Sequence, residues 1–393
     1  MIDTAAPALV RDRATWLLYL HMAAFGYFLY CFGPSVTLLG DDLGVGNAVA
    51  ALHSTAYAAA GVLIALLGDR PMRRFGRGPT LWAGCGLLSL GVLAYCAAET
   101  PAVSLSAALL SGFGAFLVVN VAGTALADHH GTTAGPSALN EANGLAAGVG
   151  MAAPLLIGVM DSSGPGWRWA MYAVPLLFGA LALGLGRTRI PDLPALAPAP
   201  VTPEAAAPGG PLPAAYWWAW LLTVCSVAVE FSLSLWASTL LRDRTGMSES
   251  AAATGMTAVV AGLCLGRLVG GRLALRLALH RLYISAVALN LVGFTMFWSA
   301  TVPWLAYLGL FVSGLGMSVQ FPLATAAAIR AAGGRADLAV SRLAVATTIA
   351  AGGAPFLLGL ATDLMPVRAA FLLLPILLVA SIPILIRSTR THG

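Results

Sequence analysis

One acidic residue stands alone in the middle of a long apolar run. Glu230 lies within WLLTVCSVAVEFSLSLWASTLL, residues 220–241, and no arginine occurs within ten residues on either side of it. An ionised carboxylate at the centre of a bilayer costs about 2.5–3.5 kcal/mol on insertion scales, so such acids usually have a function. Glu230 can load and release a proton or hold a cationic group; the structural alternative is a hydrogen bond to a neighbouring helix.

Other reactive residue types do not form a recognisable centre. Asp128, His129 and His130 are adjacent, and three consecutive side chains do not converge on one metal ion. The five cysteines lie in apolar runs without a C-x-x-C pair, which favours buried apolar side chains over disulfides or metal ligands. We find no paired acids, Ser–His dyad or phosphate-binding loop, so the sequence predicts no enzyme, no metal and no cofactor.

The composition of the chain indicates that these residues belong to a membrane protein. Of 393 residues, 59% are hydrophobic and only 9% are charged, whereas soluble domains carry about 25% charge. This excludes an ordinary soluble enzyme, a disordered chain and a nucleic-acid binder. A helix of about twenty apolar residues crosses a bilayer and satisfies its own backbone there. The sequence therefore predicts an all-α membrane protein whose main surroundings are the lipid bilayer.

Twelve apolar runs are long enough to span a membrane. We expect transmembrane helices near residues 15–39, 48–67, 79–98, 103–127, 138–160, 169–186, 215–241, 248–267, 280–300, 302–328, 340–361 and 368–386. The proline-rich stretch 187–214 cannot be helical throughout. We predict that it links an N-terminal six-helix half, residues 1–186, to a C-terminal half, residues 215–393.

The arginines predict the orientation, since the chain contains no lysine. With a cytoplasmic N-terminus, seventeen of the 21 basic residues lie in cytoplasmic segments. Only Arg168, Arg242, Arg244 and Arg368 lie on the opposite side. Cytoplasmic loops of membrane proteins are enriched in such residues. We therefore expect a multi-pass protein of the cell (inner or plasma) membrane, with both termini and the linker in the cytoplasm.

The two halves repeat one another. SVTLLGDDLG (35–44) aligns with ASTLLRDRTG (237–246), AGVL (60–63) with AGLC (261–264), SGFG (111–114) with SGLG (313–316), and APLLIG (153–158) with APFLLG (354–359). Arg168 and Pro175 align in the same way with Arg368 and Pro375. Each match is short, but all occur in order at offsets of 200–202 residues. The pattern predicts two pseudo-symmetric six-helix bundles.

This layout, together with one loop, resembles the major facilitator superfamily. The segment Gly68-Asp69-Arg70-Pro71-Met72-Arg73-Arg74-Phe75-Gly76-Arg77 is similar to the family's G-x-x-x-D-R-x-G-R loop, with four extra residues before Gly76-Arg77. The second-half counterpart, residues 266–272, keeps glycines and arginines but lacks the acid. The helix-4 arginine of drug/proton antiporters is absent, and only Pro154 and Gly158 match their helix-5 motif. The resemblance is to a bacterial transporter of this superfamily, and only weakly to its drug/proton antiporter branch.

The resemblance implies a central cavity lined by the first, fourth, seventh and tenth helices. On those helices, the substrate-binding candidates are His21, Tyr27, Tyr30, Asn120, Trp236, Ser318 and Gln320. Each is alternatively an interhelical contact or an interfacial aromatic. Glu230 is the expected proton-coupling residue of this cavity.

The resemblance also implies a gate on the cytoplasmic side. Glu141 and Arg342 occupy equivalent repeat positions on the fifth and eleventh helices. Family packing would set Glu141 against Arg267 or Arg272, and Arg342 against Asp69. These residues, with Arg70, are expected to form ion pairs that break when the halves move apart.

These expectations together describe a secondary active transporter that works by alternating access. We expect proton-coupled export of a small amphipathic or cationic organic molecule by a monomer, without nucleic-acid partners. Proton-coupled or facilitated import of a small organic solute is the alternative, and a non-transporting membrane sensor is a more remote one.

Overall fold

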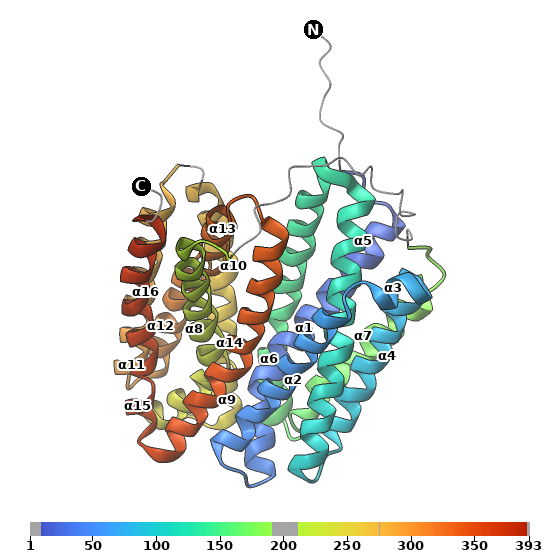
Figure 1. Ribbon diagram of the computed structural model, residues 1–393. Coiled ribbons are helices and arrows are strands. Elements are labelled where there is room, and N and C mark those ends of the chain that lie inside the picture. Colours follow the sequence, from blue (N-terminus) through green and yellow to red (C-terminus); the bar gives the residue numbers. More distant parts are fainter. Residues whose placement is uncertain (1–8, 191–210, 275, 391–393) are drawn as a thin grey trace.

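The computed structural model is a bundle of helices and describes residues 9–190, 211–274 and 276–390 (Figure 1). The first seven helices are α1 (Arg13–Asp42), α2 (Asn47–Leu67), α3 (Arg70–Phe75), α4 (Arg77–Cys96), α5 (Pro101–Gly150), α6 (Ala152–Ser162) and α7 (Arg168–Leu185). They are followed by α8 (Ala214–Thr245), α9 (Glu249–Ala253), α10 (Gly255–Ala274), α11 (Leu279–Ser299), α12 (Pro303–Met317), α13 (Gln320–Ala331), α14 (Ala336–Leu364), α15 (Val367–Ala370) and α16 (Leu373–Arg390).

Twelve spans long and apolar enough to cross a membrane occur in the described part of the chain, and the predicted all-α transmembrane fold is confirmed. The helix labelled α5 comprises two helices that meet at a kink, in the region where we expected a loop between the fourth and fifth spans. Gly131, with φ of 67°, breaks it into the spans Pro101–Gly131 and Ser137–Ser162. Glycine adopts such a positive φ at little cost, so the chain leaves the helical path at Gly131 and begins the next helix after it.

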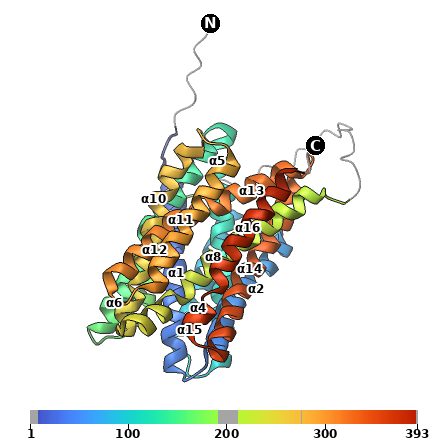
Figure 2. The ribbon, with the colours of Figure 1, turned by 90° about the vertical axis from the view of Figure 1, so that its left-hand side faces the viewer.

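The helices α1–α7 and α8–α16 form two groups that lie side by side (Figures 1 and 2). We call them the first and second halves. The starts of α1 and α8 and the end of α16 lie at one end of the bundle, the terminal end, and α9 and α15 lie at the opposite end, the far end. Most of the predicted linker falls on residues 191–210, which lie outside the described residues; residues 188–190 and 211–213, on either side of them, are not helical.

The repeated glycines make equivalent close contacts in the two halves. A Cβ atom on Gly114 would lie 2.2 Å from the backbone nitrogen of Leu88, and one on Gly316 would lie 2.4 Å from that of Asn290. Both members of these two contacts are 202 residues apart. Helices in a membrane associate through small residues that let their backbones approach closely. The SGFG and SGLG repeats therefore mark equivalent contacts, α5 on α4 and α12 on α11.

Candidate functional site

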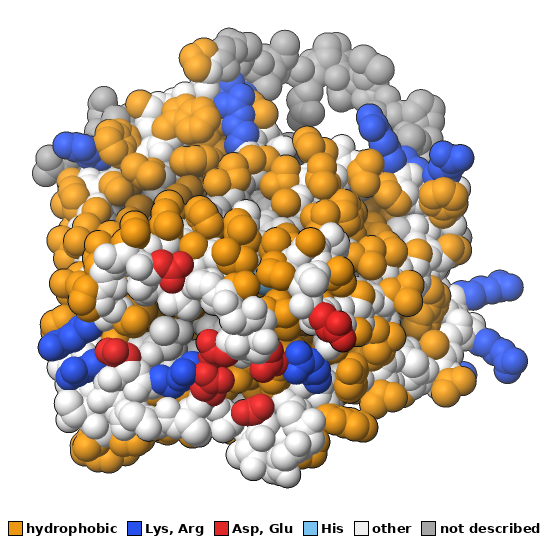
Figure 3. All heavy atoms as spheres, turned by 90° about the horizontal axis from the view of Figure 1, so that it is seen from below, with side chains coloured by type: hydrophobic (Ala, Val, Ile, Leu, Met, Phe, Trp, Pro, Cys, Tyr) orange, Lys and Arg blue, Asp and Glu red, His pale blue; other side chains and the backbone are white. Residues whose placement is uncertain are grey.

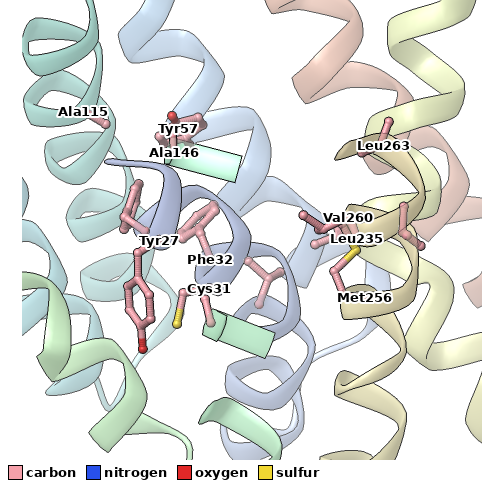
Figure 4. Packing of buried hydrophobic residues seen from close by; sticks show 14 of the residues in the cluster. Tyr27, Cys31, Phe32, Tyr57, Ala115, Ala146, Leu235, Met256, Val260 and Leu263 are labelled. Carbon is pink, nitrogen blue, oxygen red and sulfur yellow. The ribbon is translucent and has the colours of Figure 1, made fainter. Parts of the chain in front are cut away.

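A cavity of about 350 Å³ lies between the two halves. Its wall includes residues of α1, α2 and α5 from the first half and of α8, α10, α13 and α14 from the second. Figure 4 shows four of these side chains, with Phe32 and Tyr57 from the first half and Leu235 and Met256 from the second. Small-molecule pockets are mostly apolar and measure about 300–1,000 Å³, so this volume suits a small organic ligand.

Aromatic side chains dominate the wall. They are Phe25, Tyr30, Phe32, Tyr57, Phe116, Phe231 and Phe321. Hydroxyl groups come from Ser54, Ser234, Thr347 and Thr348, and the charged lining residues are Glu230 and Arg267. The cavity therefore offers a large apolar contact surface with one acid and one base.

Glu230 lies at the middle of α8 and lines this cavity. Its side chain is 18% exposed, and a carboxylate oxygen lies 4.0 Å from a guanidinium nitrogen of Arg267 on α10. Tyr30 of α1 lines the same cavity, and its hydroxyl group is within electrostatic reach of both charged groups. Glu230 thus has one neighbour from each half, Tyr30 from the first and Arg267 from the second.

Two glycines on α10 determine where Arg267 can lie. A Cβ atom on Gly266 would lie 2.3 Å from Ser318 Oγ, and one on Gly270 would lie 2.1 Å from Val319 Cγ1. One face of α10 thus packs tightly against the α12–α13 junction, and Arg267 lies on another. Residues 266–272, which the repeat predicts to be a loop, are helical, because these glycines allow close packing and do not form a turn.

Of the seven substrate-binding candidates, Tyr30 lines the cavity and the others do not. Three use their polar atoms on backbone carbonyls: Tyr27 donates to Ala170 at 2.8 Å, Trp236 donates to Pro355 at 2.8 Å, and Gln320 donates to Gly316 at 3.2 Å. The bonds of Tyr27 and Trp236 are interhelical contacts, the alternative role considered for them, whereas Gly316 lies one turn before Gln320 in the same span and the interhelical bond of Gln320 goes to Ala286 at 3.4 Å.

The remaining three candidates also lie outside the lining of the cavity. His21 is buried against the rings of Trp82 and Phe178, with centroids 4.9 and 6.0 Å away. Ser318 is buried and donates to the carbonyl of Leu315, and Asn120 is exposed on α5. The aromatic wall was missed because its members do not differ in the sequence from ordinary core residues.

The gate residues have other partners in this structure. Arg11 donates two hydrogen bonds to Glu141, at 2.9 and 2.6 Å, and Tyr19 donates a third at 3.0 Å. Glu141 is therefore satisfied within its own half rather than by Arg267 or Arg272. The bond to Glu141 also raises the pKa of the Arg11 guanidinium above its ordinary value.

The second expected pair is not formed either. Asp69 pairs with Arg73 one turn along α3, and the guanidinium of Arg342 lies 5.5 Å from the ring centroid of Trp217. Arg70 and Arg272 are exposed. Local partners therefore replace the expected contacts across the terminal end.

The loop between the second and third spans is followed by a buried arginine in an ion pair that its sequence does not predict. Arg77 is 1% exposed and forms an ion pair with Asp128 of α5, whose side chain is 46% exposed. His129 contacts Asp12 at 2.9 Å and His130 contacts Thr15 at 2.9 Å, so the three adjacent residues of this motif have three different partners. Buried arginines need such partners because an uncompensated charge is costly.

Contacts between the halves gather at the far end. The carboxylate of Asp363, at the end of α14, accepts hydrogen bonds from the backbone N–H groups of Asn47 and Ala48 at 2.9 and 2.8 Å. Arg242 of α8 pairs with Asp41 of α1 at 2.9 Å. The view of this end in Figure 3 shows acidic and basic side chains side by side. These contacts join the two halves at the far end.

Twelve spans in two similar halves, with a central cavity between them, define a transport protein of the membrane. The sequence model of the Major Facilitator Superfamily matches residues 17–253 and 219–392. The chain belongs to this superfamily, and it is a multi-pass membrane protein and a secondary transporter.

Solved structures share the fold across almost the whole chain. A bacterial homologue of the human lysosomal transporter Spinster, inward-facing and occupied, is 15% identical, with 98% of each chain covered and a TM-score of 0.73. The nucleoside transporter NupG is 12% identical, with 96% of this chain and 99% of that chain covered and a TM-score of 0.75. A D-xylose–proton symporter is 12% identical, with 97% and 98% covered and a TM-score of 0.74. No curated protein sequence matches.

Proposed function

We propose that this protein is a proton-coupled secondary transporter of a small organic molecule, with Glu230 as the coupling residue. The observation that carries the proposal is that Glu230 lies at the middle of a membrane span and on the wall of the cavity between the halves. An acid at this depth is energetically costly, and such residues usually mark substrate or proton pathways. The fold shared with a D-xylose–proton symporter supports coupling to protons.

The far-end contacts support alternating access. With the terminal end in the cytoplasm, as the arginine distribution predicts, this structure is closed toward the outside. Opening there requires breaking the Asp363–α2 bonds and the Arg242–Asp41 pair. We propose that the terminal end then closes by pairing Glu141 with Arg267 or Arg272, and Arg342 with Asp69, beside Arg70. Arg11 and Arg73 must first release the two acids.

The direction of transport depends on how substrate and proton share the cavity. Export driven by proton entry, the direction expected from the sequence, requires that the substrate and the proton exclude one another. Import requires that they bind together. Arg267 favours import as the second candidate, because a proton on Glu230 removes its partner and leaves a cation available. Proteoliposomes decide between the two: an acid compartment drives substrate away from itself in symport and toward itself in antiport.

The coupling role of Glu230 is tested by a thermal-shift screen of the purified protein against a chemically diverse panel at pH 6 and pH 8. A compound that binds only the folded state raises the melting temperature. We expect the stabilisation by a substrate to depend on pH in the wild type, and to lose this dependence in Glu230→Gln. Glu99→Gln, which removes an exposed acid between α4 and α5, is the matched control. An unchanged pH dependence in Glu230→Gln contradicts the proposal.

A further inference from the structure

The cavity holds a guanidinium group that the sequence did not place there. Arg267 lines the cavity, its side chain is 44% exposed, and its nearest carboxylate oxygen is 4.0 Å away on Glu230. This distance lies beyond hydrogen-bond range, so Glu230 only partly satisfies Arg267. An arginine is charged at all physiological pH values, and its planar fork of donors fits a carboxylate or phosphate group.

This geometry favours an anionic ligand, whereas the sequence alone favoured an amphipathic or cationic one. A cationic ligand on Glu230 would lie next to the permanent charge of Arg267 and be repelled. An anionic ligand on Arg267 would be repelled by Glu230 only while that carboxylate is ionised. Like charges a few ångströms apart are costly in a partly buried site. Protonation of Glu230 therefore removes this repulsion and also removes the negative charge that balances Arg267.

The rest of the wall indicates the body of the ligand. Phe231, Phe321 and Phe116 belong to three different helices and line the same cavity as the ion pair. Aromatic rings bury a large apolar area and prefer edge or offset contacts with other rings. A ligand with one anionic end and an apolar, preferably aromatic, body matches both parts of the wall.

We propose that the substrate is an amphipathic organic monocarboxylate that binds with its carboxylate on Arg267 after Glu230 has taken up a proton. This inference rests on the proposed function and specifies its substrate class. The proton and the anion occupy the cavity together, so the occupied site gains no net charge. Such joint binding corresponds to symport.

Few other titratable groups surround the pair. They are Tyr30 on α1, Tyr57 on α2 and Cys264 on α10, whereas α13 and α14 contribute Phe321, Thr347 and Thr348 to the cavity. Tyrosine and threonine do not ordinarily change charge between pH 6 and pH 8. Cys264 is the group whose titration could be confused with that of Glu230, so Cys264→Ala belongs among the controls.

Three probes with one body and different ends test the proposal: 4-phenylbutyrate, 4-phenylbutanamide and 4-phenylbutylamine. The carboxylate and the ammonium keep their charges between pH 6 and pH 8. Calorimetric binding to the purified full chain should rank the carboxylate first at pH 6 and weaken it about tenfold at pH 8. Glu230→Gln should give the tighter affinity at both pH values. Arg267→Gln should weaken carboxylate binding about 10- to 100-fold, the usual effect of losing a charged hydrogen bond.

Control variants separate the site from general effects of charge. Arg281→Gln removes an exposed arginine of α11 and should leave carboxylate binding unchanged, as should Cys264→Ala at both pH values. Arg267→Lys keeps the charge without the planar fork and should recover part of the affinity. Melting temperatures measured without ligand show that each variant is folded.

Several results would overturn the proposal. These are tighter binding of the amine than of the carboxylate, unchanged carboxylate affinity in Arg267→Gln, and no carboxylate binding at millimolar concentration. If the amine binds with a pH dependence that Glu230→Gln abolishes, the substrate class is wrong while proton coupling stands. If carboxylate binding requires Arg267 but ignores pH and Glu230→Gln, the proton-gated site and the coupling role of Glu230 both fail.

Discussion

At the far end, a carboxylate from one half binds the helix backbone of the other, and the proposed alternating access requires this contact to break. Asp363 accepts hydrogen bonds from the N–H groups of Asn47 and Ala48, the first residues of α2. Asp363→Asn keeps the shape, but it removes the charge at a helix N-terminus and replaces one of the two acceptor oxygens by an NH2 group, at a cost of about 1–2 kcal/mol. Because Asp363 and α2 separate when this end opens, the cost falls on the closed state alone. A loss of about 1–2 kcal/mol shifts the ratio of closed to open molecules about 5- to 30-fold.

Distances between two spin labels measure this ratio. Ala97 and Thr301 are exposed at the far end of opposite halves, after α4 and α11, and can carry labels in a background without the native cysteines. Asp363→Asn should increase the long-distance population. Asp243→Asn, which removes a charge near the same end of α8, should not. Unchanged distances in Asp363→Asn, or an equal change in Asp243→Asn, would refute the capping argument.

Three further predictions concern stability. Gly114→Ala should lower the melting temperature because the new Cβ meets the backbone of α4, whereas Gly86→Ala, with open space around it, should not lower it. Asp128→Asn should destabilise the protein by about 1–3 kcal/mol by weakening the partner of buried Arg77, and an unchanged denaturation midpoint would contradict this. Burial raises the pKa of Asp12, but hydrogen bonds from Thr15 and His129 outweigh it and lower the pKa overall. Stability from this cap should therefore be present above the ordinary pKa of aspartate and lost as the pH falls through the lowered value, and Asp12→Asn should flatten that part of the pH–stability curve.

The fold could be predicted because its causes are spread along the chain. Each span can be recognised by its length and apolar character, and the proline-rich stretch after residue 186 separates the halves. The repeat was visible because Gly114 and Gly316 cannot change without moving a neighbouring helix. Helix ends were less accessible: the Gly266–Gly270 pair is typical of a turn, and only its packing partners show that α10 continues.

The site was predicted where one residue type was out of place and missed where residue types were ordinary. Glu230 is conspicuous in an apolar span, and it lines the cavity. Trp236 and Gln320 are polar residues on suitable helices, yet their polar atoms bond to carbonyls of neighbouring turns and helices. Phe231 lies one residue from Glu230 and belongs to the wall, but a phenylalanine in a membrane span carries no signal of its own. Which face of a helix meets the cavity is decided by packing that involves distant residues.

Glu230 and Arg267 occupy positions whose counterparts in the first half are uncharged. At the offset of 202 that aligns α1 with α8, Glu230 corresponds to Phe28, and at the offset of 201 that aligns α2 with α10, Arg267 corresponds to Leu66. Phe28 is fully buried and Leu66 is 70% exposed, so neither position in the first half supplies a charge to the cavity. The repeated residues maintain two similar bundles that can move against one another, and the unrepeated pair supplies the chemistry from one side. The proposed substrate would therefore meet its charged partner on the second half and a mainly aromatic surface on the first, where Tyr30, Ser54 and Tyr57 supply hydroxyl groups.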